Sequence, residues 1–366
     1  MTVNQNDPLE YQQQLDRKVI EFRQTMATAG ISISDIAVHS SEPLAFRMRA
    51  EFRIWHEQGS VHYAMNRPGE KRPFIIEDFP IGAPLIAELM PPLLDALNNS
   101  QILSRKCFSA EFLTTKSGEA LITLIYHRPL DNDWEREACA LQTQLGVKII
   151  GRSRKQKLVL DQDFVTERLS INGREYSYQQ VESGFTQPNA GINQQMLSWA
   201  SHCLSQSQGD LLELYCGNGN FTAVLAQHFE HVMATEISKV SVNSAQTNFA
   251  NNQIDNVTVV RMSSEEFTQA LNGERPFRRL ADIDLAEYNF STIFVDPPRA
   301  GLDQATEKLV SRFDNILYIS CNPQTLANNL TAITKTHAIE AVALFDQFPW
   351  THHVESGVLL RKRQEN

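Results

Sequence analysis

Long apolar runs are missing from this sequence of 366 residues. Spanning a bilayer as a helix takes roughly 18–20 consecutive apolar residues, and no segment approaches that length. The first residues, MTVNQNDPLEYQQQ, also lack the basic flank and apolar core of a signal peptide. These absences predict a cytoplasmic protein without a membrane partner.

Cysteine is scarce, and the five cysteines lie far apart with no C-x-x-C pair. That spacing argues against a zinc ribbon, an iron–sulfur cluster and a disulfide framework, so we expect no metal. Each thiol must therefore be explained singly, by packing or as a nucleophile. The five are Cys107, Cys139, Cys203, Cys216 and Cys321.

Basic charge is also in short supply, since 33 Lys and Arg face 43 Asp and Glu, a formal net charge of −10. A nucleic-acid partner needs a basic footprint, but net charge describes the whole surface and not one site. Residues 1–187 carry 21 basic and 24 acidic side chains, whereas residues 188–366 carry 12 and 19. Most of the net negative charge thus belongs to the second half.

The length exceeds the usual single core of about 250–300 residues and predicts two domains. We place the boundary after residue 184, where the pattern changes. The first part alternates in short segments at 45–55, 60–65, 107–115 and 120–130, with helical patterns at Glu10–Met26, Pro84–Leu97 and Asp133–Leu145. It predicts an α+β domain, 1–184, with a mainly antiparallel sheet.

The second part, 185–366, alternates apolar strands with amphipathic helices, as in a doubly wound α/β domain. Helical patterns such as Phe221–Phe229 and Val240–Asn251 separate the strands. The expected strands are 211–216, 231–236, 256–260, 291–296, 315–320 and 342–348, followed by a last strand in GVLLRK.

A candidate nucleoside site follows the first of these strands. Gly217 and Gly219 stand between a strand and a helix, where glycine permits a tight turn and close approach of a ligand. Glu236 ends the next strand, where a carboxylate can accept hydrogen bonds from ribose hydroxyls. The third glycine of a dinucleotide motif is replaced by Thr222, so a tight turn without a ligand is the alternative.

Two further strands end in reactive side chains at the ligand-binding edge of such a sheet. Asp296 opens the segment DPPRAGLD, and Cys321 follows the strand YIS. A capped turn and a core cysteine are the structural alternatives. Asn322 and Pro323 begin a helix whose N-terminus is expected to stabilise the Cys321 thiolate.

Near the C-terminus, Glu355 precedes the last strand and is a candidate base. His352 and His353 are its rivals for proton transfer, and a solvated glutamate is the structural alternative. The two histidines lack further metal ligands at a suitable spacing.

Six ordered motifs resemble those of the RNA uracil-5-methyltransferases, over essentially the whole chain. The cysteine cluster of the family's rRNA-modifying relatives is absent, and so is an N-terminal oligonucleotide-binding barrel, which favours the tRNA-modifying branch. The motifs are FTQPN (185–189), ELYCGNGNF (213–221), ATE (234–236), FVDPPRAGLD (294–303), YISCNP (318–323) and HHVESGVLL (352–360).

The resemblance implies methylation of uridine 54 in the tRNA T loop to ribothymidine, and of T-like loops such as that of tmRNA. It implies that Cys321 adds to uracil carbon 6 and that Glu355 removes the proton from carbon 5. S-adenosylmethionine would be the methyl donor, without a metal or an obligate protein partner. The implied cofactor contacts are Gln187, Tyr215, Asn220, Glu236 and Asp296. The alternatives are rRNA methylation, or an RNA-binding folding factor with secondary methylation activity.

RNA contacts are expected in the first part of the chain. Strand alternation in AFRMRAEFRIW puts Arg47, Arg49 and Arg53 on one face, with Glu51 as a balancing charge. Phe108 is the candidate wedge for the extruded base, and His127 is a second contact. Basic residues also gather in GRSRKQK (151–157), although a solvated loop or strand face is the alternative for each group.

Overall fold

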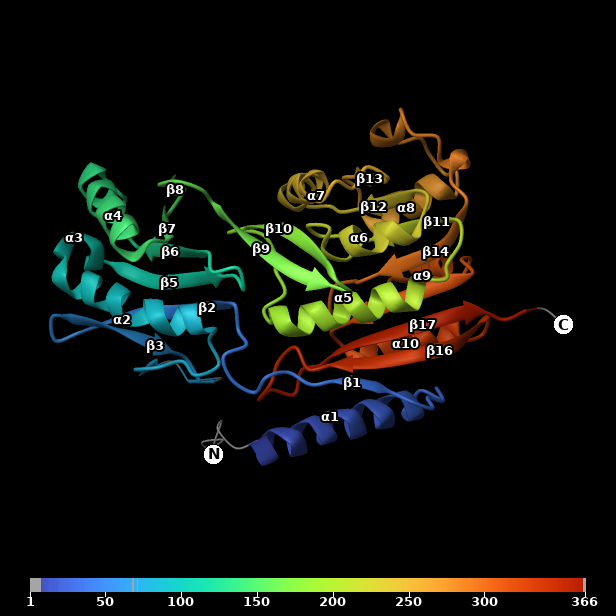
Figure 1. Cartoon of the computed structure of the whole chain (residues 1–366), viewed down its shortest axis with the longest axis horizontal. Helices are drawn as coiled ribbons and strands as arrows, with labels where there is room; N and C mark the ends of the chain where they lie inside the picture. Colours follow the sequence, from blue (N-terminus) through green and yellow to red (C-terminus); the bar gives the residue numbers. More distant parts are fainter. Residues whose placement is uncertain (1–7, 68, 71, 365–366) are drawn as a thin grey trace. The chain divides into compact units, whose positions relative to one another are not determined.

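The computed structural model describes residues 8–67, 69–70 and 72–364. The first seven residues of the N-terminal segment, which was compared above with a signal peptide, therefore lie outside the described residues. The chain folds into two compact units (Figure 1). Unit 1 comprises Met1–Glu42, Leu169–Tyr178 and Gly191–Asn366, and unit 2 comprises Pro43–Arg168 and Gln179–Ala190. The chain therefore crosses between the units several times, unlike the single boundary expected after residue 184.

Unit 1 is built on an eight-stranded sheet of order β1-β16-β17-β15-β14-β11-β12-β13. Its pairs are parallel except for the two that involve β17, which runs antiparallel to β15 and β16. This is the predicted doubly wound domain. Its strands are β1 (Ala37–His39), β11 (Asp210–Leu214), β12 (Val232–Thr235), β13 (Val257–Val260), β14 (Phe290–Val295), β15 (Asn315–Ser320), β16 (His337–Phe345) and β17 (Glu355–Lys362).

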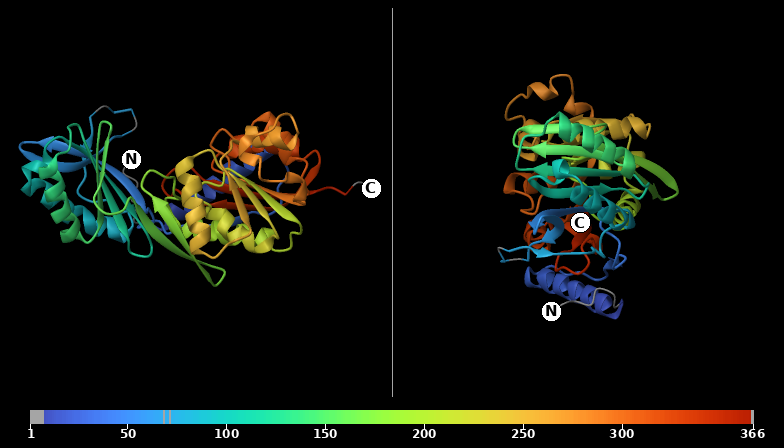
Figure 2. Two further views of the ribbon diagram at one scale, coloured as in Figure 1. Left: turned by 90° about the horizontal axis from the view of Figure 1, so that it is seen from above. Right: turned by 90° about the vertical axis from the view of Figure 1, so that its left-hand side faces the viewer.

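Helices cover both faces of this sheet (Figure 2), because successive side chains of a strand point to opposite faces. Ile293 of β14 lies in one core cluster, whereas the neighbouring Phe294 packs on Phe221 on the other face. The helices of unit 1 are α1 (Pro8–Thr28), α5 (Ala190–Leu204), α6 (Asn220–Leu225), α7 (Lys239–Asn251), α8 (Ser264–Leu271), α9 (Gln304–Val310) and α10 (Pro323–Ile333).

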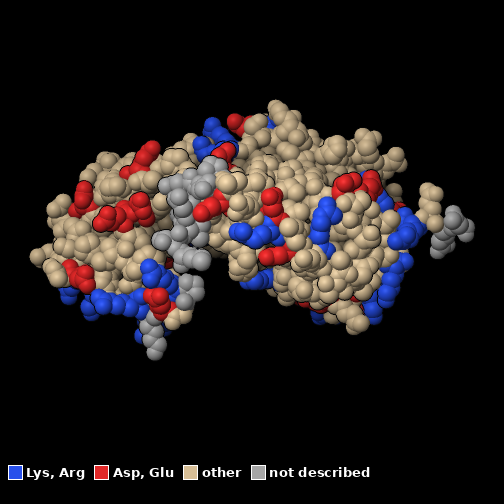
Figure 3. Space-filling model, turned by 90° about the horizontal axis from the view of Figure 1, so that it is seen from below, with Lys and Arg blue, Asp and Glu red and all other residues tan. Residues whose placement is uncertain are grey.

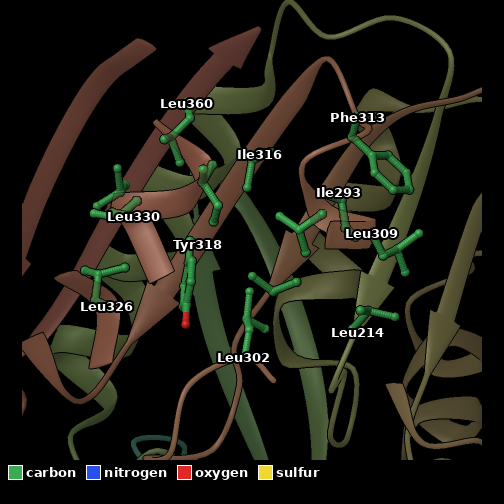
Figure 4. Close-up of a cluster of buried hydrophobic side chains, with 14 of the residues drawn as sticks. Leu214, Ile293, Leu302, Leu309, Phe313, Ile316, Tyr318, Leu326, Leu330 and Leu360 are labelled. Carbon is green, nitrogen blue, oxygen red and sulfur yellow. The ribbon is translucent and has the colours of Figure 1, made fainter. Parts of the chain in front are cut away.

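The apolar core on one face fixes the central strands against α9 and α10. Ile293 and Tyr318 of the sheet lie in one cluster with Leu309 of α9 and Leu330 of α10 (Figure 4). All four side chains are essentially inaccessible to solvent. Burial at roughly 25 cal/mol per Å² of apolar area holds the carboxyl ends of β14 and β15 in register, and these ends carry Asp296 and Cys321.

Helix α1 belongs to this core, although the sequence pattern placed it with the first domain. Phe22 and Met26 are buried in the same cluster as Leu330 of α10. Strand β1 then pairs in parallel with β16 and extends the sheet at its edge. The expected assignment of the N-terminal segment to the antiparallel domain is therefore wrong, because its apolar stripe completes the core of unit 1.

Unit 2 is the predicted α+β domain, with a seven-stranded sheet of order β4-β3-β2-β5-β6-β7-β8. All its pairs are antiparallel except β6 with β7. Its elements are β2 (Arg49–Glu57), β3 (Ser60–Met65), β4 (Phe74–Ile75), α2 (Pro84–Asn99), α3 (Gln101–Ser104), β5 (Cys107–Thr114), β6 (Ala120–Tyr126), α4 (Asn132–Leu145), β7 (Lys148–Ser153) and β8 (Gln156–Val159). A hairpin of β9 (Phe164–Ile171) and β10 (Arg174–Val181) contributes residues to both units.

The basic segment 151–157 forms the turn of the β7–β8 hairpin, where a solvated loop was the alternative to an RNA contact. Two of its cations are paired inside unit 2. Both oxygens of the Glu182 carboxylate accept from Arg152 at 2.5 Å, and Lys157 contacts Asp163 at 2.7 Å. These two side chains therefore stabilise the hairpin.

Candidate active site

The glycine turn after β11 has the backbone that the motif predicts. Gly217 has φ +56° and Gly219 has φ +78°, a region that favours glycine. A Cβ atom on Gly219 would lie 2.6 Å from the Phe249 ring, whereas one on Gly217 would meet nothing within 4 Å. Gly219 is therefore required for packing, and Gly217 leaves open space beside the turn.

Glu236 follows β12 and ties the glycine turn to the neighbouring strand. Its Oε2 accepts from the Gly217 N–H at 3.1 Å, and its Oε1 accepts from the Ser238 N–H at 2.7 Å. These bonds fix the orientation of the carboxylate. Each oxygen keeps a further lone pair, which suits the predicted contact with ribose hydroxyls.

Tyr215 and Asn220 flank the glycine turn and are both held by hydrogen bonds. Tyr215 has φ +64°, and its hydroxyl donates to Ser264 Oγ at 2.7 Å. The amides of Asn220 and Asn193 exchange two hydrogen bonds, of 2.8 and 3.0 Å. Two predicted cofactor contacts thus adjoin the turn in fixed orientations, and Asn193 is a supporting residue that the motif did not reveal.

Gln187 belongs to a different compact unit from the other four predicted cofactor contacts. It lies in the Gln179–Ala190 segment of unit 2, whereas the other four belong to unit 1. Its cofactor role stays a prediction.

Three reactive side chains lie at the ends of adjacent strands of unit 1. Asp296 follows β14, Cys321 follows β15, and Glu355 is the first residue of β17. Ser320 of β15 pairs with Ser356 of β17, so Cys321 and Glu355 flank that antiparallel pair at the same end. β14 is parallel to β15 on the other side, and Asp296 follows its last residue. The topology therefore brings a thiol and two carboxyl groups to one edge of the sheet.

The Cys321 thiol is partly buried and is a weaker acid than an ordinary cysteine. Burial, together with the charges of Glu355 and Asp296, raises its pKa to about 11, while Arg299 acts in the opposite direction. The expected stabilisation of the thiolate by the α10 N-terminus is outweighed in the free protein. Ionisation of this thiol therefore depends on what binds beside it.

Glu355 is buried, and burial raises its pKa well above the ordinary value, with Asp296 as a second cause. Burial also raises the pKa of Asp296 to about 7. His352 is exposed and His353 is half-buried, and both lie in the loop before Glu355. Glu355 is thus buried at the start of β17, whereas both histidines lie in the preceding loop, and the choice of base among the three stays a prediction.

Glu213 is a buried acid that the sequence interpretation passed over, although it stands in the first motif. It lies in the interior of β11, and among the described residues its Oε2 has no hydrogen-bond partner. Burial raises its pKa to about 8, and the Asp296 charge contributes in the same direction. The signal in the sequence was an acidic residue inside the apolar run LLELYC.

Replacing Glu213 by Gln should change the pH dependence of stability. The native carboxyl holds its proton up to about pH 8, whereas the unfolded one releases it near its ordinary pKa of 4.5. The free energy of unfolding of the parent protein therefore falls as pH rises between these values. Between pH 4.5 and pH 7 the parent should lose on the order of 3 kcal/mol that the variant does not lose, as measured by urea unfolding of both proteins. Parallel pH profiles for the two proteins would contradict the assignment.

In unit 2, the candidate RNA contacts divide into two groups. Arg47 precedes β2 and donates to the Arg49 carbonyl, and burial lowers its pKa. Arg49 donates to the carbonyls of Gly184 and Glu182 and lies 3.6 Å from the Glu111 carboxylate. Both guanidinium groups therefore bind the fold of unit 2 itself.

Arg53, Phe108 and His127 form the second group and lie together. The Phe108 and His127 rings stack with centroids 4.3 Å apart, and the Arg53 guanidinium lies 5.3 Å from the centre of the Phe108 ring. They line a pocket of about 430 Å³ that Trp55 and Lys106 also border. Stacked rings with cations beside them suit a nucleobase next to a phosphate.

A solved structure shares the fold described above. The crystal structure of Pyrococcus abyssi tRNA (uracil-54, C5)-methyltransferase in complex with S-adenosyl-L-homocysteine matches with a TM-score of 0.73 at 20% identity, over 96% of this chain and 83% of that one. This likeness shows that the two proteins share a fold.

The family follows from the sequence matches. A family model described as tRNA (Uracil-5-)-methyltransferase matches residues 10–363. A tRNA/tmRNA (uracil-C(5))-methyltransferase of Saccharophagus degradans is 55% identical over 99% of both chains, and one of Cellvibrio japonicus is 56% identical over 96% of both. The chain belongs to the tRNA (uracil-5-)-methyltransferase family, and it is an enzyme.

No group of three or more His, Cys, Asp or Glu side chains suited to a metal ion occurs among residues 8–67, 69–70 and 72–364. Within the same part of the chain, no helix is long and apolar enough to cross a membrane.

Proposed function

We propose that this enzyme methylates carbon 5 of uridine 54 in the T loop of tRNA through a covalent intermediate on Cys321. The meeting of Cys321, Glu355 and Asp296 at one sheet edge carries the proposal. The printed names of the relatives, tRNA/tmRNA (uracil-C(5))-methyltransferase, support tRNA and extend the proposal to the T-like loop of tmRNA.

S-adenosylmethionine fits the residues around the glycine turn. The open space beside Gly217 and the oriented carboxylate of Glu236 suit a ligand with ribose hydroxyls and positive charge. Tyr215, Asn220, Glu236 and Asp296 would hold it, together with Gln187 by resemblance. When bound, it supplies an electrophilic methyl group.

Carbon 5 of uracil is a weak nucleophile, and Cys321 activates it by covalent addition. The thiolate of Cys321 forms a bond to carbon 6, and the electron pair of the C5–C6 double bond moves toward carbonyl oxygen 4. The resulting enolate makes carbon 5 the nucleophile that accepts the methyl group. The adduct then carries a methyl group and a proton on carbon 5.

Glu355 completes the reaction by removing that proton. As its carboxylate takes the proton from carbon 5, the C–H electron pair re-forms the C5–C6 double bond, and the bond from carbon 6 to sulfur breaks. Cys321 leaves as the thiolate. The buried position of Glu355 favours proton acceptance, because a raised pKa makes the carboxylate a stronger base.

The RNA contacts are assigned to Arg53, Phe108 and His127. The net charge of −10 is no obstacle, because basic side chains gather locally: on the face shown in Figure 3, Lys and Arg line the lower left margin, where unit 2 lies. A uracil stacked in a folded loop must be extruded, and an aromatic plane can replace its stacking.

Replacing Phe108 by Ala should weaken tRNA binding about 5- to 150-fold, because base–aromatic stacking contributes about 1–3 kcal/mol. Filter binding and single-turnover methylation of full-length tRNA measure the effect. Phe74→Ala is the matched control, since that exposed ring also carries an arginine, Arg67, 4.8 Å from its centre. Ordinary affinity and rate for Phe108→Ala would remove the assignment.

The substrate is tested by incubating the enzyme with labelled S-adenosylmethionine and either undermethylated tRNA or rRNA, followed by nucleoside analysis. The proposal expects 5-methyluridine in tRNA. Label in rRNA alone would point to the ribosomal alternative, and RNA binding without methyl transfer would point to a folding factor.

A further inference from the structure

Glu355 is reached through a nine-residue loop, Asp346–Val354, between β16 and β17. The strand pair Phe345–Glu355 closes this loop, so its first residue adjoins the strand position opposite the proposed base. The orientation of Glu355 at the start of β17 therefore depends on how the loop is held.

The N-terminal half of α1 binds this loop at three points. Lys18 Nζ donates to Asp346 Oδ1 at 2.6 Å and to the Phe348 carbonyl at 3.0 Å. Gln14 Oε1 accepts from the Trp350 N–H at 2.7 Å. Tyr11 donates through its hydroxyl to Asp346 Oδ2 at 2.9 Å.

Forming these contacts costs free energy, and the backbone of the loop is strained at Trp350. Lys18 and Asp346 are 3% and 0% exposed, and a buried ion pair must repay the desolvation of both charges. Trp350 has φ +66°, a conformation that a bulky side chain rarely adopts without support. Helical spacing puts Tyr11, Gln14 and Lys18 on one face of α1.

The C-terminal half of α1 has a different partner. Phe22 and Met26 pack in the apolar core with α10, which anchors the helix in unit 1. α10 itself follows Cys321 by way of its N-cap residue, Asn322. One helix thus connects the element that follows the proposed nucleophile to the loop that precedes the proposed base.

We propose that α1 is a positioning element for proton removal, in which Gln14, Lys18 and Tyr11 fix the Asp346–Val354 loop and thereby the Glu355 carboxyl. This inference rests on the proposed function, because it concerns the elimination that releases methylated RNA from Cys321. Nucleophilic addition and methyl transfer precede that step and do not need Glu355 as a base. Loss of the α1 contacts should therefore slow release more than methyl transfer.

The test uses Gln14→Ala, because Gln14 is only partly buried and its loss leaves the ion pair intact. Single-turnover reactions with T-arm RNA and labelled S-adenosylmethionine, quenched in denaturant, separate protein-bound methylated RNA from released product. We expect release to slow about 10-fold while methyl transfer changes less than about twofold, so the methylated adduct accumulates. Gln14→Glu keeps an acceptor for the Trp350 N–H and should restore release.

Gln13→Ala is the matched control, because Gln13 is an exposed glutamine on the same helix. It should leave both rates unchanged. Equal slowing of both steps in Gln14→Ala, or no change in either, while Glu355→Gln accumulates adduct, would overturn the positioning role and leave the proposed function standing. Failure of Glu355→Gln itself to accumulate adduct would instead overturn the proposed mechanism, and the inference with it.

Discussion

Cys321→Ala should abolish methyl transfer to tRNA, with a rate loss on the order of 10⁴-fold or more. Without the thiolate no bond forms to carbon 6, and carbon 5 remains too weak a nucleophile to take a methyl group. Binding of tRNA should persist, because the proposed contacts lie in unit 2. Single-turnover methylation and filter binding of the same preparation measure the two effects.

Cys139→Ala is the control for this experiment, because Cys139 is an exposed free cysteine in α4 of unit 2. It should methylate at the parent rate. The covalent mechanism fails if Cys321→Ala keeps substantial activity.

Glu355→Gln should stall the reaction after methyl transfer and accumulate a methylated enzyme–RNA adduct that survives denaturant. Gln cannot accept the proton from carbon 5, so elimination slows by about 10²–10⁴-fold, the usual contribution of a general base. Denaturing gels with labelled S-adenosylmethionine detect the adduct, and multiple-turnover assays detect the lost turnover.

His352→Gln and His353→Gln provide the comparison, since both histidines lie in the loop before Glu355. Their side chains are exposed or half-buried, and their substitution should leave turnover near the parent rate. If a histidine substitution traps the adduct and Glu355→Gln does not, the base is a histidine and the present assignment is wrong.

The chemistry-bearing strand ends could be predicted from the sequence because each lies in a local pattern. Apolar runs such as NILYIS predict buried strands, and the carboxyl ends of parallel strands meet at one edge, which brings Asp296 and Cys321 together. Glu355 reaches that edge by a different route, since β17 is antiparallel and contributes its first residue. The sequence showed Glu355 before a last strand as one of three candidate bases, and the family resemblance singled it out from His352 and His353.

What the sequence could not show are the contacts between distant segments. Lys18 and Asp346 lie 328 positions apart, and neither stands in a motif that predicts the other. The amphipathic stripe of α1 shows that the helix packs on something, but the core that it joins is chosen by tertiary structure. The same holds for Arg49, whose expected phosphate contact competes with carbonyl groups 133 and 135 positions away.

The pKa of the Cys321 thiol also depends on contacts that the local sequence does not show. Its position before a helix predicts a lowered pKa. Burial, together with the carboxyl groups of Glu355 and Asp296 from separate strands, raises the pKa to about 11 instead. Local sequence gives the helix N-terminus, while the sheet edge supplies the opposing carboxyl groups. On the proposed mechanism, the bound reactants must therefore lower the pKa of the Cys321 thiol before it can add to carbon 6.

The most direct test of this account is mass spectrometry of the enzyme trapped on tRNA that carries 5-fluorouridine at position 54. Fluorine replaces the proton that Glu355 must remove, so elimination cannot follow methyl transfer. The account predicts a peptide in which Cys321 is joined to a methylated 5-fluorouridine from nucleotide 54. Unmodified Cys321 in an enzyme that methylates ordinary tRNA, or an adduct on another residue or nucleotide, would contradict it.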